Sequence, residues 1–490
     1  MFKISPFFGL FLALGLTLVP AVGQESPAAR AQTLLKQGKA ESALPILLEL
    51  HRATPSDANL CQQIGIAYTQ LNDLAHAEEF YREAVRLNPQ FDAARKNLGT
   101  VLWFLNRRDD SEREFLVVTK SLPADPVPHL YLGLAAVGRH EFAHAKSEFE
   151  RAGTLASANP EVIQPVLEAY LATRDLSFPT EVLEQLTRAE NPDSEISFRV
   201  AALFLRYGYY EQAATLCNKI ISVSQESAET WRLLAEAYDR QQKPERAYSA
   251  YSRAIEIDPT SENSYLALAE FASAHANNSY ALQVVARGLN RLPRSASLRF
   301  EEGILFSLMG DRTKAQSSFS EASRLKPEWN LPWLALGVSA LESGNAAQAV
   351  ALFDKARTID PHDARASYLY ALAISKESAD SGTNRASATA ALHKAIELDA
   401  RDAASHSLLG HFELAAGNAP AAEREWETAL KLDPRNTTAL YQLSLLYRKE
   451  GRTERAKQLL ERFRQVKTKQ RSEETQLVEI LKVVPRSAAH

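Results

Sequence analysis

A short stretch near residue 140 carries the residue types of a zinc peptidase. Residues 140–144 read His-Glu-Phe-Ala-His. This is the H-E-x-x-H pattern, which places two imidazole ligands on one helix face and a glutamate beside them as general base. A metalloprotease interpretation makes His140 and His144 the zinc ligands and Glu141 the base. Such a site needs both histidines in one continuous helix and a third ligand that converges on the metal.

The residues around this stretch favour a structural interpretation. The longer pattern H-E-x-x-H-x-x-G-x-x-H fails at Ser147 and Glu150. We expect Gly138 in the turn within a helix pair and His140 at the start of the second helix. The motif then falls in a first turn, where a third ligand does not converge. His140 and His144 are thus weak metal candidates, and the sequence predicts no metal site, no cofactor and no catalytic residue.

The elements that position this stretch are set by a repeat of 34 residues. Several segments share an alanine, a bulky residue four positions later, then a small residue, an aliphatic residue and a closing proline. This spacing marks one face of a helix that ends at a residue unable to continue it. The clearest examples are residues 77–89, 247–259, 315–327, 349–361 and 422–434.

A second helix is expected before each of these, with a signature of its own. Trp333, Leu336 and Gly337 match W-x₂-L-G, and residues 231–238 carry a related pattern. The sequence therefore resembles the tetratricopeptide repeat (TPR) family over residues 28–468. The resemblance implies an all-α fold, an α-α superhelix formed by a TPR solenoid of about thirteen helix pairs. It also implies that the first helices of the pairs line a concave groove.

The N-terminus differs from the rest of the chain. Lys3 is followed by an apolar run over residues 7–19, and small residues precede Gln24. This is typical of a secretory signal peptide over residues 1–23, cleaved before Gln24. The apolar run is shorter than the roughly 20 residues of a spanning helix. We expect a periplasmic or secreted protein that does not span the membrane after cleavage.

Repeat regularity divides the remainder into four parts. Residues 24–158 form an N-terminal TPR block, 159–226 are irregular TPR-like units, 227–468 form a C-terminal TPR block, and 469–490 form a capping helix and tail. We expect residues 376–387, which are polar and too long for the repeat, to form an extended loop.

Composition narrows the classes of partner. The 490 residues carry a net charge of −4 and a pI near 6.3, so no global field favours nucleic acid. A basic segment over residues 448–471 is either a solvated helix face or a contact for an anionic partner. Cys61 and Cys217 are the only cysteines, and we expect both to be buried as small hydrophobic residues.

The resemblance also selects residues that would line the groove. Aromatic and polar side chains at the family's groove positions suit an extended peptide or a partner helix. We therefore expect a non-enzymatic scaffold or adaptor of the bacterial cell envelope with a protein or peptide partner. The alternatives are a metal-dependent hydrolase that uses residues 140–144, and an array that binds a glycan or another cell-wall component. The candidate groove residues are Lys96, Asn97, Trp103, Tyr131, Arg232, Glu236, Phe300, Tyr368, His411 and Tyr441.

Overall fold

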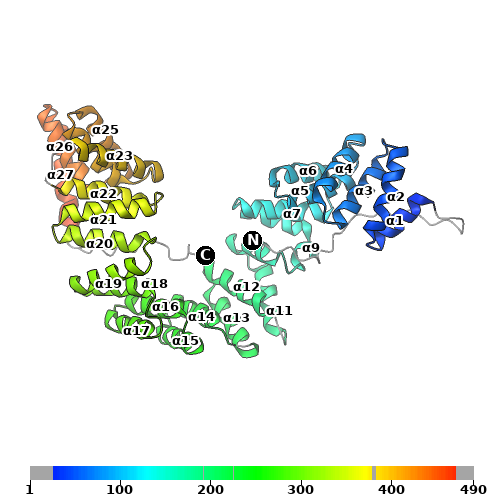
Figure 1. Cartoon of the computed structure of the whole chain (residues 1–490), viewed down its shortest axis with the longest axis horizontal. Coiled ribbons are helices and arrows are strands. Elements are labelled where there is room, and N and C mark those ends of the chain that lie inside the picture. The colour runs from blue at the N-terminus through cyan, green and yellow to red at the C-terminus, as the bar shows by residue number, and fades with distance from the viewer. Residues whose placement is uncertain (1–25, 191–192, 225, 378–381, 471–490) are drawn as a thin grey trace. The chain divides into compact units, whose positions relative to one another are not determined.

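A computed structural model describes residues 26–190, 193–224, 226–377 and 382–470, and every regular element within them is a helix (Figure 1). The chain divides into two compact units. Unit 1 comprises the residues up to Glu226 together with Glu236–Pro244, and unit 2 comprises Ser227–Ala235 together with the residues from Glu245. The predicted all-α solenoid of helix pairs is confirmed.

Most helices are 13 residues long when first in a pair and 14 residues when second. The helices of unit 1 are α1 (Pro27–Lys36), α2 (Ala40–Ala53), α3 (Ala58–Gln70), α4 (Leu74–Leu87), α5 (Asp92–Phe104), α6 (Arg108–Ser121), α7 (Pro126–Gly138), α8 (Phe142–Ala152), α9 (Thr154–Ser157), α10 (Ile163–Ala172), α11 (Ser177–Arg188), α12 (Ser194–Arg206) and α13 (Tyr210–Val223).

The unit boundary runs through the next two helices, α14 (Ala228–Arg240) and α15 (Pro244–Ile257). Unit 2 continues with α16 (Glu262–Ala274), α17 (Asn278–Arg291), α18 (Ala296–Leu308), α19 (Arg312–Leu325), α20 (Asn330–Glu342), α21 (Ala346–Ile359), α22 (Ala364–Lys376), α23 (Gly382–Leu398), α24 (Ala403–Ala415), α25 (Ala419–Leu432), α26 (Thr437–Lys449) and α27 (Thr453–Gln470).

Short polar side chains start many of these helices. The Asp57 and Asp402 carboxylates accept hydrogen bonds from backbone N–H groups in the first turns of α3 and α24. The Asn345 amide oxygen does the same at the start of α21. These caps satisfy donors that have no partner inside the helix. Asp-Pro and Asn-Pro sequences form the turns before other helices. There the Asp258 and Asn88 side chains accept hydrogen bonds from the backbone N–H groups two residues later in the chain.

Every helix pair whose turn is fully described has one residue with a positive φ angle in that turn. The spacing is 34 residues from Gly38 to Gly344 without a break, and it resumes between Gly417 and Gly451. Six of these positions hold residues other than glycine, which rarely adopt this conformation. The residues that keep the spacing are Gly38, Asn72, Asn106, His140, Arg174, Gly208, Gln242, Ala276, Gly310 and Gly344.

Glycine on the first helix meets an aromatic ring on the second. A Cβ atom placed on Gly65 would lie 2.6 Å from the Tyr81 ring, and one on Gly337 would lie 2.5 Å from the Phe353 ring. The same contact, with a spacing of 16 residues, joins Gly410 to Trp426. The absence of a side chain lets the two helices approach, and the ring fills the space between them.

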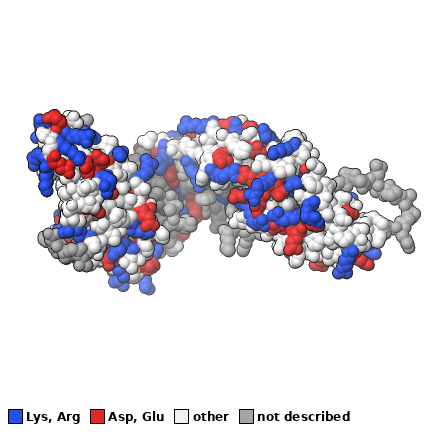
Figure 2. Space-filling view, turned by 90° about the horizontal axis from the view of Figure 1, so that it is seen from above, with Lys and Arg blue, Asp and Glu red and all other residues white. Residues whose placement is uncertain are grey.

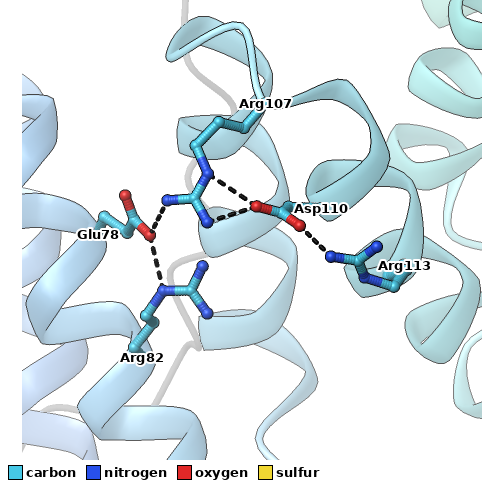
Figure 3. A network of polar contacts seen from close by, with 5 residues as sticks. All are labelled: Glu78, Arg82, Arg107, Asp110 and Arg113. Atoms are coloured by element: carbon cyan, nitrogen blue, oxygen red, sulfur yellow. Dashed lines mark hydrogen bonds and ion pairs between the residues drawn. The ribbon is translucent and has the colours of Figure 1, made fainter.

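Charged side chains connect neighbouring repeats on the second-helix face of unit 1 (Figure 3). Arg107 donates to Glu78 on α4 at 2.6 Å and also pairs with Asp110 on α6. Arg82 donates to the same Glu78 oxygen at 2.7 Å, and Arg113 pairs with Asp110. These groups are partly exposed, so each pair contributes little stability on its own. Together they link α4 to the start of α6.

The loop expected over residues 376–387 is shorter than predicted. Helix α23 already begins at Gly382 and has 17 residues instead of 14. Part of the extra sequence therefore extends the second helix of its pair. The predicted signal peptide (1–23) and most of the predicted capping segment (469–490) lie outside the described residues. The other predicted boundaries stay predictions.

The distribution of surface charges and the burial of the cysteines agree with what the composition predicts. Figure 2 shows basic and acidic side chains interspersed on the faces in view. Among the described helices, none combines the length and the apolar character that crossing a bilayer requires. Cys61 and Cys217 are both buried as free thiols, as predicted. Burial raises the pKa of the Cys61 thiol to about 11, so it is unreactive at neutral pH.

Candidate functional site

Unit 1 contains a pocket of about 360 Å³ that lies against helices α3, α5 and α7. This volume is within the range of sites that hold small ligands or a few residues of a peptide. The structure brings three of the predicted groove residues together here: Lys96, Asn97 and Tyr131. The lining residues are Thr69, Tyr81, Lys96, Asn97, Thr100, Val101, Phe104, Val127, Leu130, Tyr131, Thr154, Leu155, Ala158, Asn159, Pro160 and Glu161.

The polar floor of this pocket holds a buried amide with a free donor. Asn97 is 6% exposed, and its Nδ2 atom has no hydrogen bond of good geometry to any described residue. Burial raises the pKa of the nearby Tyr81 hydroxyl, and the Thr69 and Asn97 side chains partly oppose that rise. A buried donor without a partner costs about 1–3 kcal/mol, which a ligand acceptor would offset.

Neighbouring groups already have partners, which leaves Asn97 as the distinctive donor. The Lys96 ammonium donates to Asp125 at 2.5 Å, so its charge is balanced. The Thr69 hydroxyl donates to the Gly65 carbonyl at 2.8 Å and lies 3.1 Å from the Tyr81 hydroxyl. Tyr81 therefore donates to Thr69.

Aromatic stacking holds Tyr131 in place. Its ring is parallel to that of Phe115, with centroids 5.0 Å apart, and burial raises the pKa of Tyr131 to about 12. Trp103 packs against Tyr131 at 5.2 Å, and the Arg108 guanidinium covers Trp103 at 3.6 Å. Trp103 thus packs against the pocket residue Tyr131 but does not itself line the pocket.

The outer wall of the pocket comes from an unusual connection. Helix α8 ends at Ala152 after 11 residues, and Gly153 has φ +56° and ψ −132°. Residues 154–161 then contribute to the pocket lining before α10 begins at Ile163. Sequence reasoning missed this wall. A signal was present, since Gly153 lies where the second helices of other repeats continue.

We expect Gly153→Ala to destabilise unit 1 by about 1–3 kcal/mol, because an alanine side chain disfavours this backbone conformation. Gly138→Ala is a matched control. Neither glycine has an atom within 4 Å of an added Cβ, but Gly138 lies in α7 with an ordinary φ angle. Urea denaturation followed by circular dichroism measures both variants. Equal stability of the two alanine variants would contradict the role given to the Gly153 conformation.

Unit 2 contains a second, smaller pocket of about 270 Å³, which brings together the predicted residues Tyr368 and His411. Burial raises the pKa of Tyr368 to about 12, with a further contribution from the Asp402 charge. Burial lowers the pKa of His411, and the nearby Lys376 ammonium lowers it further. The lining residues are Tyr368, Leu372, Ser375, Lys376, Ala404, Ser407, Leu408, His411, Asn436 and Thr438.

The remaining predicted groove residues do not line either pocket. Phe300 is 6% exposed and lies in the core between Phe319 and Trp329. Tyr441 is 41% exposed and packs on Phe463 at 5.3 Å. Arg232 and Glu236, on α14, are half-buried. A binding role for these residues stays a prediction.

The His-Glu-Phe-Ala-His stretch does not form the helix of a zinc peptidase. His140 has φ +60° and is the turn residue of its pair, while Gly138 ends α7, so the expected placement of both was wrong. Helix α8 begins only at Phe142, so His140 and His144 do not lie four residues apart on one helix. Glu141 pairs with Arg139 at 3.1 Å. The described residues contain no cluster of three potential metal ligands.

The sequence and the fold of this chain are similar to those of known proteins. Sequence models described as tetratricopeptide repeat match residues 58–91, 228–271, 300–364, 334–374 and 407–466. The chain belongs to the tetratricopeptide repeat family. The first pocket lies partly within the first of these matches, whereas the 154–161 wall lies in a part of the chain that they do not cover.

A curated human relative, tetratricopeptide repeat protein 21A, is 25% identical over 248 residues, which is 45% of this chain. This TPR chain matches only 18% of the length of that relative. Among solved structures, yeast Tom70 is 14% identical, with a TM-score of 0.41 and coverage of 94% of this chain and 99% of that chain. The Cut9–Hcn1 structure of the APC/C is also 14% identical, with a TM-score of 0.39 and coverage of 94% and 96%.

Proposed function

We propose that this TPR protein is an exported, non-enzymatic adaptor of the bacterial cell envelope that holds a segment of a partner protein in the first pocket of unit 1. The family membership supports the general part of this proposal, because TPR arrays are protein-interaction scaffolds that are generally not catalytic. Export rests on the signal-peptide pattern of residues 1–23.

The buried Asn97 amide is the observation that carries the pocket assignment. Asn97 lines the pocket together with Phe104, Leu130 and other apolar side chains, and its buried Nδ2 atom has no hydrogen-bond partner of good geometry among the described residues. A peptide carbonyl would accept from Asn97 while neighbouring side chains pack against these apolar groups. Binding would thus give the buried Asn97 amide the hydrogen-bond acceptor that it lacks in the free protein.

A photo-crosslinking amino acid at position 104 tests the proposal in cells. We expect it to capture one partner protein, and we expect Asn97→Leu to weaken binding of that purified partner by at least about tenfold, or 1.4 kcal/mol. Asn290→Leu is a control on the exposed surface of α17. A second crosslinker at Glu79, exposed on α4, measures background capture.

Two results would overturn the proposal. The partner could crosslink equally from positions 79 and 104, or it could bind the Asn97→Leu protein as tightly as the original. Export has a separate test. Mass spectrometry of the purified protein is expected to find Gln24 as the first residue, and an intact residue 1–23 segment on cytoplasmic protein would contradict export.

A further inference from the structure

The second pocket differs chemically from the first and calls for a different ligand. Ser407 is 3% exposed, and its hydroxyl has no hydrogen-bond partner among the described residues. A helical serine usually donates to the carbonyl four residues earlier. Here the Ala403 carbonyl instead accepts from the Asn436 amide, at 3.5 Å. Ser407 lines the pocket, and its buried hydroxyl has no partner there.

The described groups around Ser407 can donate hydrogen bonds, and none of them is an acid. Among the described lining residues, Lys376 is the only one with a permanent charge, and no aspartate or glutamate is present. Tyr368, His411 and Thr438 add a hydroxyl, an imidazole and a second hydroxyl. The Asn436 side-chain amide oxygen already accepts from the Ala439 backbone N–H at 2.9 Å.

We propose that this pocket binds a compact anionic group, a carboxylate or a phosphate, and that binding is coupled to uptake of a proton at His411. The Ser407 hydroxyl and the Lys376 ammonium donate to the anion, and the protonated imidazole adds a second positive charge beside it. This site is separate from the first pocket and does not depend on the partner proposed there.

The charges that face His411 set the direction of the coupling. Lys376 lies on α22 and opposes protonation of the imidazole. Asp402 caps α24 and acts on Tyr368, and the lining groups at the start of α26, Asn436 and Thr438, are neutral. A bound anion stabilises the imidazolium and so raises the lowered pKa of His411. Binding is then strongest below that pKa and weakens as the pH rises through it.

Nuclear magnetic resonance of histidine-labelled protein tests this proposal. The His411 signals are assigned with a His411→Gln variant and followed between pH 5 and 8, with sodium phosphate, sodium acetate or sodium chloride at equal ionic strength. We expect one of the two anions to raise the His411 midpoint by about one unit relative to chloride, and to bind about tenfold more tightly at low pH. The anion with the larger effect distinguishes a phosphate ligand from a carboxylate ligand.

His406 is an internal control on the same helix. Its Nδ1 atom pairs with Glu425 at 2.7 Å, and it does not line the pocket. Its midpoint is expected to stay fixed. Ser407→Ala and Lys376→Met are each expected to abolish the anion-dependent shift at His411. An unchanged His411 midpoint in both anions, equal movement of His406, or a shift that survives both substitutions would overturn the proposal.

Discussion

Trp426→Ala is expected to lower the free energy of unfolding of unit 2 by about 3–5 kcal/mol, which is the usual cost of removing a large aromatic side chain from a core. Trp426 is 0% exposed, and its indole donates to the Ser407 carbonyl at 3.0 Å. The substitution leaves a cavity between α24 and α25 and removes the hydrogen bond from the indole to the Ser407 carbonyl. Urea denaturation followed by circular dichroism and hydrogen exchange measures the loss.

A double-mutant cycle with Gly410 isolates the reason for this cost. A Cβ on Gly410 would lie 2.6 Å from the Trp426 indole nitrogen, so Gly410→Ala is expected to destabilise the original protein by about 1–3 kcal/mol. In the Trp426→Ala background the same change meets no ring, and we expect it to be neutral or stabilising. Additive costs in the double variant would contradict the close approach of the two helices.

Trp333→Ala is a matched control for side-chain size. Trp333 is half-buried, and its indole donates to the Pro327 carbonyl at 3.0 Å. We expect a clearly smaller loss than at Trp426. Because stability in a repeat array is nearly a sum of local terms, hydrogen exchange should show the Trp426→Ala effect to be largest in α24 and α25.

Much of the fold could be predicted because the repeat positions hold residues whose size decides how the two helices of a pair pack. The glycine and aromatic positions, such as Gly337 and Phe353, recur at fixed spacing and meet as expected. The turn positions were harder to recognise. Arg174 and Gln242 occupy the same left-handed turn as Gly310, but nothing in their side chains marks the conformation. In those pairs the packing of the helices fixes the turn.

The candidate sites could be predicted only in part. The structure brings the predicted groove residues Lys96, Asn97 and Tyr131, which lie on the successive first helices α5 and α7, to one pocket, and their binding role stays a prediction. Tyr81 was not among the predicted residues, because it lies on a second helix, α4. Its ring reaches the pocket by packing against Gly65, which has no side chain. Phe300 matched a groove position as well, but Trp329 from the following loop covers its ring at 4.9 Å. Contacts between repeats therefore decide which groove residues stay accessible.

The second large effect is expected at a buried ion pair in unit 1. His129 is 2% exposed, and its Nδ1 atom lies 2.6 Å from a Glu148 oxygen. Its Nε2 atom lies 2.9 Å from the Pro123 carbonyl. In its protonated form the imidazole donates from both ring nitrogens, to the Glu148 carboxylate and to the Pro123 carbonyl, and forms an ion pair with Glu148. Arg95 and Glu114 form a pair at the same spacing one repeat earlier.

We expect Glu148→Ala to lower the free energy of unfolding of unit 1 by about 3–5 kcal/mol, because it leaves a buried charge without its partner. Glu148→Gln keeps an acceptor for His129 and is expected to cost less. His129→Leu/Glu148→Leu removes both charges and should recover most of the loss, since an apolar pair carries no desolvation penalty. His406→Leu, at the more exposed pair with Glu425, is the matched control. A double variant no more stable than Glu148→Ala would show that shape at this position, rather than charge pairing, holds α7 against α8.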